Sequence, residues 1–270
     1  MATRPVAPKW AYGVTTCVQR RGEVLNATLN SLKNAGFENP HLFVDGCDDS
    51  ADWAREYGLT VTARGGRPTL AFGNWVLALA ELFIRHPDST HFAVFQDDFL
   101  TYRNLRQYLE RALYPQKCYL NLYTFPSNEG SRLREVRKPA PDDDYIGFYR
   151  SNGAGRGAVG LVFRRQAVLA LLTHTNITER PLAVKGWKNL DGGVVTAMTK
   201  MEWEEYVHFP TLTYHTGQKS TIRNKPHHQG VCFLGEEYDA LNLLTTTAAE
   251  VRATAARVAR RGQEVSHGAG

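Results

Sequence analysis

Two adjacent carboxylates, Asp97 and Asp98, follow the apolar run Phe92–Phe95 after a single residue, Gln96. A buried strand that ends on such a pair presents both carboxylates at the edge of a sheet. Mg²⁺ and Mn²⁺ prefer oxygen ligands, and carboxylates often share the cation with the phosphates of a nucleotide. The sequence therefore predicts a metal ligand at Asp98, with Asp97 beside it. The alternative is that Asp98 only caps a helix over 102–112.

A histidine and several basic residues follow another predicted strand, Thr211–Tyr214. His215 stands at the end of that strand, where a ring nitrogen can complete the coordination of a metal. The segment behind it contains Lys219 and Arg223, and no acid occurs before Glu236. This stretch suits a pyrophosphate or another polyanion. The alternative is a solvated basic loop with a histidine that is hydrogen-bonded structurally.

A third group of candidates surrounds Asp191, at the start of a predicted helix over Leu190–Lys200. Asp191 is a candidate general base that takes a proton from an acceptor hydroxyl. Trp187 is a candidate platform for a sugar or base ring, and Asn189 lies between them in the sequence. The alternative is that Asn189 or Asp191 satisfies the free amides at the helix start.

The segment Ser151–Gly160 is rich in glycine, which allows a close backbone approach to a ligand or a flexible lid. No Gly-Lys-Ser/Thr follows it, so it is not a phosphate-binding Walker loop. The first predicted strand also lacks the GxGxxG turn of a dinucleotide site. The alternative is a simple hairpin or loop connection.

The elements that must position these residues alternate between strands and helices in the first hundred residues. Such alternation predicts βαβ units and a mostly parallel sheet, whose ligands bind outside the carboxyl ends of the strands. The hydrophobic pattern predicts strands over 11–17, 41–44, 59–62, 91–95 and 161–163, and helices over 23–35, 50–57, 70–84, 166–173 and 245–261. Gly262 is the expected cap of the last helix, before a disordered tail.

The composition indicates an ordinary globular protein. The chain has 270 residues, of which 43% are hydrophobic and 22% charged, with a net charge of +5. These values exclude wholesale disorder, collagen, a coiled coil and a small disulfide scaffold. The mild excess of positive charge allows an anionic ligand such as a nucleotide.

Four cysteines lie far apart and form no CxxC pair, which indicates reduced thiols and a cytoplasmic setting. Residues 1–9 contain no apolar leader, and no window reaches the roughly 18 apolar residues of a membrane span. We therefore expect a cytoplasmic protein with no membrane span.

Taken in order, these motifs resemble the nucleotide-sugar glycosyltransferases of the GT-A fold, and family 2 in particular. The resemblance covers roughly residues 11–229. Gln96-Asp97-Asp98 stands at the place of the family's DxD motif, whose last aspartate binds the metal, and Gln96 replaces the usual first acid. Asp191 falls where inverting members carry their catalytic acid residue. His215 falls in the closing segment, whose histidine often binds the metal.

The resemblance implies an α/β fold of GT-A type: a single domain with a Rossmann-like, mostly parallel sheet flanked by helices. It places an N-terminal extension at 1–10, the GT-A domain at 11–244, and a C-terminal helix with a disordered tail at 245–270. The activity it implies is hexosyltransferase-like transfer from a UDP-sugar, with Mn²⁺ or Mg²⁺ as cofactor and inversion at the anomeric carbon.

The same resemblance assigns roles to individual residues. Asp191 is the expected catalytic base, Asp98 and His215 are the expected metal ligands, and Trp187 with Asn189 lines the acceptor side. The expected donor-binding residues are Thr15, Thr16, Asp45, Arg64, Asn74, Asp97, Lys219 and Arg223.

The identity of the acceptor stays open between a saccharide and DNA. The positive balance and the arginines at 132, 134, 137, 150 and 156 would tolerate a polyanion, so transfer to modified DNA bases is an alternative. A nucleotidyltransferase would use the same carboxylates but release pyrophosphate. An inactive module that binds nucleotide sugars or nucleic acid is a further alternative, favoured by Gln96.

Overall fold

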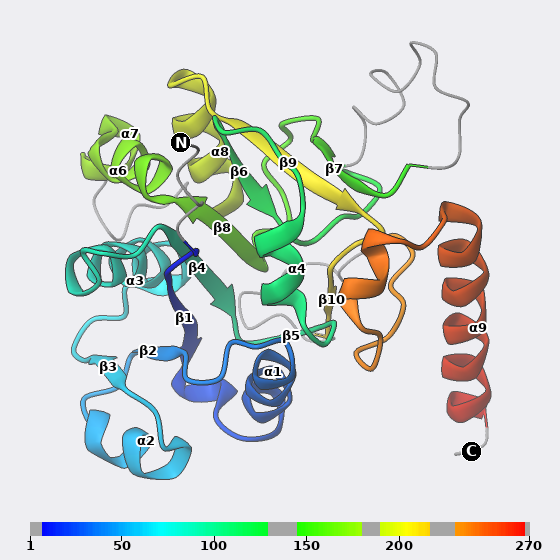
Figure 1. Cartoon of the computed structure of the whole chain (residues 1–270). Helices are drawn as coiled ribbons and strands as arrows, with labels where there is room; N and C mark the ends of the chain where they lie inside the picture. The colour runs from blue at the N-terminus through cyan, green and yellow to red at the C-terminus, as the bar shows by residue number, and fades with distance from the viewer. Residues whose placement is uncertain (1–6, 129–144, 180–189, 217–229, 268–270) are drawn as a thin grey trace.

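The computed structural model describes residues 7–128, 145–179, 190–216 and 230–267 (Figure 1). Its strands are β1 (Trp10–Cys17), β2 (His41–Asp45), β3 (Val61–Arg64), β4 (His91–Gln96), β5 (Phe99–Thr101), β6 (Cys118–Asn121), β7 (Gly147–Arg150), β8 (Gly160–Arg164), β9 (Glu204–Phe209) and β10 (Thr213–His215). Its helices are α1 (Glu23–Asn34), α2 (Ser50–Tyr57), α3 (Leu70–Arg85), α4 (Leu105–Arg111), α6 (Arg165–Thr173), α7 (Thr175–Thr178), α8 (Leu190–Lys200) and α9 (Ala248–His267), with short 3₁₀ turns η1 (Val18–Arg20) and η2 (Ala240–Leu244).

Eight strands form one sheet in the order β3-β2-β1-β4-β8-β6-β9-β7. The first four are mutually parallel, and β8 and β7 run against their neighbours. The order 3-2-1-4 is that of a Rossmann-like half, with β1 and β4 side by side at its centre. The predicted class, a single α/β domain with a mostly parallel sheet flanked by helices, is confirmed.

The sheet is covered on both faces, and the alternation of side chains along β4 shows how. Phe92 and Val94 pack in a core with α3, α6 and α8, whereas Ala93 and Phe95 pack on the opposite face with α1 and α4. This period of two is what a strand buried on both sides requires. Figure 1 shows the two sets of helices on either side of the sheet, with α9 at the far end from α2.

Leu79→Ala is expected to destabilise the fold by about 2–5 kcal/mol, because it removes a fully buried side chain of α3 and leaves a cavity. Chemical denaturation measures the loss. Ile84→Ala in the same helix is the matched control, because Ile84 is 76% exposed and should change stability by less than about 0.5 kcal/mol. Equal losses in both variants would contradict the assigned faces of α3.

Three local predictions are corrected by the structure. The third strand begins at Val61 rather than Leu59, because Gly58 caps α2 in a left-handed conformation and the chain must turn before it pairs with β2. Asp98 does not cap a helix, because β5 follows it and pairs with β10. The last helix continues through Gly262 to His267, since one glycine inside a helix costs only about 1 kcal/mol.

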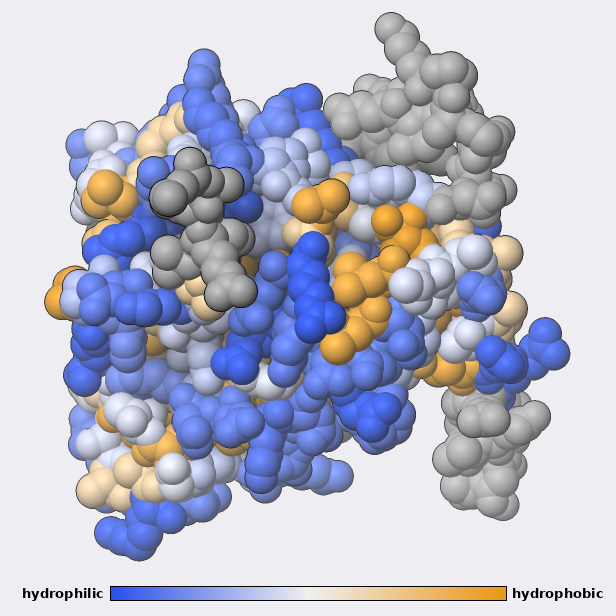
Figure 2. All heavy atoms as spheres, viewed as in Figure 1, coloured by the Kyte–Doolittle hydropathy of each residue, from blue (hydrophilic) through white to orange (hydrophobic). Residues whose placement is uncertain are grey.

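The surface seen in Figure 2 is mostly hydrophilic, with hydrophobic residues gathered in small areas. Across the described residues, no helix combines the length and apolar character that crossing a membrane requires.

His208 is a fully buried histidine in β9 that is held in its neutral form. Nδ1 lies 2.7 Å from the carbonyl oxygen of Pro210, which can only accept, so Nδ1 donates and Nε2 accepts from the Tyr108 hydroxyl at 2.5 Å. Burial lowers the pKa of His208 to about 4.

Acid is therefore expected to destabilise the fold through His208. The unfolded chain binds a proton below about pH 6.5, whereas the folded chain resists it down to about pH 4. This contribution to stability is complete above pH 6.5 and is lost as the pH falls toward 4, by about 2 kcal/mol between pH 7 and 5. Urea denaturation at both pH values tests it: His208→Gln should lose less stability than the wild type over this interval. An equal loss would contradict the assignment.

Candidate functional site

The carboxyl ends of β1 and β4 bring two predicted donor-binding residues into contact. The parallel register pairs Thr15 with Gln96, so the next residues on both strands meet at the sheet edge. The Thr16 hydroxyl donates to Asp97 Oδ2 at 2.5 Å, and the Thr15 hydroxyl donates to the carbonyl oxygen of Phe95 at 3.1 Å. The sequence correctly placed these residues at one edge.

Burial changes the ionisation of Asp97. Its pKa is raised to about 7, first by desolvation and then by the negative charge of Asp98, while the Thr16 hydrogen bond opposes the shift. Close to neutral pH, a substantial share of Asp97 is protonated.

Asp98 and His215, which are far apart in the sequence, meet through the small sheet of β5 and β10. The antiparallel register sets His215 opposite Phe99, and the backbone amide of Thr216 donates to the carbonyl oxygen of Asp98 at 2.9 Å. His215 Nε2 lies 3.5 Å from Asp98 Oδ1. That oxygen is buried and has no hydrogen-bond partner in the described part of the chain. The arrangement leaves a carboxylate oxygen and an imidazole nitrogen side by side.

Arg20 is a site residue that the sequence reasoning missed. It ends η1, directly after β1, and its Nη2 lies 3.0 Å from Asp98 Oδ2. The side chains of Arg20 and Asp98 are only 12% and 7% exposed. The available signal was a basic residue a few positions beyond the first strand, at the edge where parallel sheets bind ligands.

Asp45 lies at the same edge, but its carboxylate is engaged within the protein. It accepts hydrogen bonds from the Thr69 amide and hydroxyl at 2.9 and 2.8 Å, and from the Leu70 amide at 2.8 Å. These bonds hold the start of α3, where Leu70 has a φ of +61°. A contact between Asp45 and a nucleoside stays a prediction.

Asn74 and Arg64 connect the ends of β1 and β2 to α3. The Asn74 amide donates to the carbonyl oxygens of Thr16 and Phe43 at 3.2 and 3.0 Å, and its oxygen accepts from Arg64 Nε at 2.9 Å. Arg64 also lies 3.4 Å from Glu81, and burial lowers its pKa. Both residues shape the sheet edge, and their contact with a donor stays a prediction.

Gln96, which departs from the acidic pattern, connects the site to the glycine-rich segment. Its side-chain amide donates to the carbonyl oxygen of Ala158 at 2.9 Å, a bond that an ionised acid cannot donate. Gly157 has a φ of +80°, and a Cβ there would lie 2.8 Å from the rings of Tyr123 and Phe125. This glycine therefore permits close packing against the protein's own aromatic rings.

A buried polar network holds the rest of this segment. Glu205 accepts from the Ser151 hydroxyl at 2.5 Å and from the Asn121 amide at 3.1 Å, and Asn121 also donates to the carbonyl oxygen of Arg156 at 3.1 Å. Buried polar groups with complete partners specify one conformation. These contacts hold Ser151 and the backbone of Arg156 against β6 and β9, whereas Asn152, Gly153 and Ala154 are exposed.

Several predicted residues fall beyond this geometry. Trp187, Asn189, Lys219 and Arg223 lie outside the described residues. Asp191 is the second residue of α8, but its side chain is outside the described part. Their roles in catalysis, acceptor binding and phosphate binding stay predictions.

The donor set near Asp98 fits a divalent cation that arrives with an anionic ligand. Among the described residues, no group of three or more His, Cys, Asp or Glu side chains is arranged to hold a metal alone. Asp98 Oδ1, which has no hydrogen-bond partner in the described part of the chain, and the ring nitrogen of His215 would supply two ligands. Mg²⁺ sites commonly combine one or two carboxylates with substrate phosphates and water.

The fold and the site thus define an α/β protein with a Rossmann-like sheet. Its polar, basic and acidic side chains gather where β1 and β4 lie side by side and the strand order reverses. No family model matches the chain, and no curated protein matches it in sequence. Among solved structures, mannose-1-phosphate geranyltransferase from Thermus thermophilus is 16% identical over 73% of each chain, with a TM-score of 0.44.

A second similar structure is S. aureus TarS, which is 12% identical with a TM-score of 0.47. The match covers 78% of this chain and 37% of TarS, so the chain spans well under half of that structure. Both similarities are distant.

Proposed function

We propose that this protein is a glycosyltransferase that moves a sugar from a nucleotide-diphosphate sugar, preferably a UDP-sugar, to an acceptor hydroxyl. One observation carries the proposal. At the carboxyl ends of β1 and β4, beside the Arg20 guanidinium, an Asp98 oxygen without a hydrogen-bond partner among the described residues faces His215. In an open α/β sheet this edge is the usual ligand site. Its mixture of carboxylate, imidazole and guanidinium suits a metal-bound diphosphate.

The donor is expected to lie across the ends of β1, β2 and β4. Thr15 and Thr16 are expected to contact the nucleoside. Asp45, Arg64 and Asn74 are expected to line the other side of the donor site. Lys219 and Arg223 are expected to supply positive charge to the leaving diphosphate, where negative charge develops in the transition state.

Asp98 and His215 would hold Mn²⁺ or Mg²⁺, with Asp97 beside them. When bound, the cation supplies Lewis-acid stabilisation to the diphosphate. Asp191 takes the proton from the acceptor hydroxyl, and attack from the face opposite the leaving group inverts the anomeric centre. Trp187 and Asn189 orient the acceptor.

A saccharide is the favoured acceptor over DNA. Arg150, one of the arginines that would tolerate a polyanion, forms an ion pair with Glu204 at 3.1 Å that partly offsets its charge, whereas Arg156 is exposed. The positions at 132, 134 and 137 lie outside the described residues. Binding to duplex DNA that falls steeply with salt would reverse this preference.

A thermal-shift panel of nucleoside diphosphates, each with and without Mn²⁺, tests the donor site. A ligand that binds only the folded state raises its apparent stability. We expect a selective shift with UDP that requires Mn²⁺. No shift with any nucleoside diphosphate would overturn the donor assignment and favour a different class of protein.

A further inference from the structure

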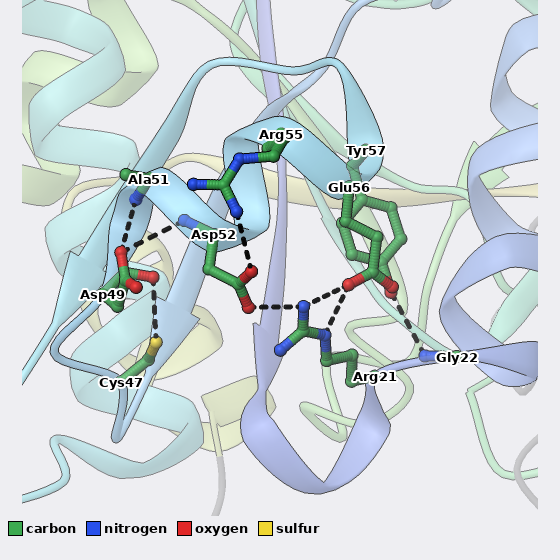
Figure 3. Close-up of polar contacts among 9 residues, drawn as sticks. All are labelled: Arg21, Gly22, Cys47, Asp49, Ala51, Asp52, Arg55, Glu56 and Tyr57. Carbon is green, nitrogen blue, oxygen red and sulfur yellow. Dashed lines mark hydrogen bonds and ion pairs between the residues drawn. The ribbon is translucent and has the colours of Figure 1, made fainter.

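Two neighbouring arginines, Arg20 and Arg21, extend in opposite directions from the turn after β1. Figure 3 shows the Arg21 guanidinium between Asp52 and Glu56 of α2. The same guanidinium lies 4.9 Å from the centre of the Trp53 ring, and the next amide, Gly22, donates to the Tyr57 hydroxyl at 3.1 Å. The turn is thereby attached to α2 at several points.

Arg20 extends inward from this attached turn. Its guanidinium contacts Asp98 Oδ2 at 3.0 Å, and only 12% of the side chain is exposed. The second oxygen of the same carboxylate, Oδ1, faces His215 and has no hydrogen-bond partner among the described residues. One oxygen of the Asp98 carboxylate therefore pairs with Arg20. The other oxygen, beside His215, is the open position for a cation.

A divalent cation at the open position would share Asp98 with Arg20. Even with Asp97 and Asp98 both ionised, the guanidinium and the divalent cation together leave an excess of positive charge. In a buried setting, such like charges repel strongly. A diphosphate removes this repulsion, because its oxygens can bond to a guanidinium and to a cation at once.

We propose that Arg20 is a second cationic contact for the donor diphosphate and makes metal binding depend on the diphosphate. This inference rests on the proposed function and adds the order of binding at the same site. Arg20 weakens the affinity for the cation alone and strengthens the affinity for the nucleotide with its cation. Arg21 acts as a positioning residue, because it holds the turn that directs Arg20 to Asp98.

The competing explanation is that Arg20 is only a structural counter-ion for Asp98. Removing one partner of a buried ion pair leaves an uncompensated charge and disturbs its surroundings. That role predicts that loss of Arg20 does not weaken the binding of Mn²⁺ alone, because Asp98 loses its counter-ion, and that it causes no specific loss of affinity for UDP at saturating Mn²⁺. The proposed role predicts changes of opposite sign for the metal and the nucleotide.

Arg20→Met provides the test, because methionine retains part of the aliphatic volume and removes the charge. The affinity for Mn²⁺ alone is measured by titration with detection of free Mn²⁺, and the affinity for UDP is measured calorimetrically at saturating Mn²⁺. We expect Mn²⁺ alone to bind about ten-fold more tightly than to the wild type, and UDP to bind at least about ten-fold more weakly. Arg111→Met is the matched control, because Arg111 is an exposed arginine in the last turn of α4 and should change neither affinity.

Arg20→Lys keeps the charge and loses the planar fork of donors, so it should leave Mn²⁺ affinity near the wild-type value and weaken UDP binding several-fold. If Arg20→Met does not fold, the UDP affinity of Arg20→Lys provides the test. Unchanged UDP affinity in a folded Arg20 variant, or weaker binding of Mn²⁺ alone to Arg20→Met, overturns the role of Arg20. Failure of the wild type itself to bind any nucleoside diphosphate with Mn²⁺ overturns the proposed function instead.

Discussion

Asp98→Asn is expected to abolish the Mn²⁺-dependent thermal shift with UDP and to lower the rate of sugar transfer by at least about 10²-fold. Asparagine keeps the shape of the side chain but removes the charge that faces His215 and binds Arg20. Its carbonyl oxygen is a neutral and weaker ligand for a cation, and its NH₂ group cannot accept a hydrogen bond from Arg20. Metal stabilisation of a developing charge contributes several kcal/mol, which corresponds to a loss of this size.

Asp88→Asn is the control for Asp98→Asn. Asp88 is an exposed aspartate in the loop before β4, so its substitution should leave the site intact. Transfer is followed with UDP-sugars and simple saccharide acceptors, and the fold is checked by circular dichroism. Because Arg20 would lose its partner, Asp98→Asn is also expected to lower the thermal stability. Wild-type metal stimulation in a folded Asp98→Asn protein would show that the cation, if used, binds elsewhere.

Asp191→Asn is expected to lower the turnover number by about 10²–10⁴-fold, the usual contribution of a general base. Asp191 lies in the first turn of α8, and a general base of this kind acts on the acceptor hydroxyl and not on the donor diphosphate. The affinity for UDP with Mn²⁺ should therefore remain within about two-fold of the wild type. Initial rates at saturating donor and acceptor, with calorimetry of UDP binding, separate the two quantities.

Glu202→Gln is a suitable control for Asp191, because it neutralises an acid just beyond the other end of α8 whose side chain is 85% exposed. A turnover number near the wild-type value in Asp191→Asn would reject the base assignment. Equal losses of turnover and UDP affinity would indicate damage to the donor site.

The placement of Asp97, Asp98, Thr15 and Thr16 could be predicted because it depends on local patterns. An apolar run that ends on polar residues defines a strand and its carboxyl end. Parallel neighbours then bring their carboxyl ends to one edge, and the contact between Thr16 and Asp97 follows. The helix over Leu190–Lys200 was predicted with its observed bounds for the same reason.

Other contacts depend on pairing between distant segments and could not be predicted in this way. Asp98 meets His215 only because β5 and β10 pair, and the sequence pattern did not predict the three-residue strand β5. Gln96 departs from the acidic motif in the sequence, and in the structure its side-chain amide donates to the carbonyl oxygen of Ala158. Asp45 was predicted to contact the nucleoside, and the structure adds three hydrogen bonds that it accepts from the start of α3.

Local hydrophobic periodicity and turn residues are sufficient to predict the α/β class, most of the strands and helices of the first half, and the sheet edge where the chemistry is expected. The pairing of the polar side chains could be read from the folded chain alone. Arg20 pairs with Asp98, Asp45 accepts hydrogen bonds from the start of α3, and Asp98 Oδ1 faces His215. The physical reason is that hydrogen bonds and ion pairs depend on distances between atoms of segments that are remote in the chain.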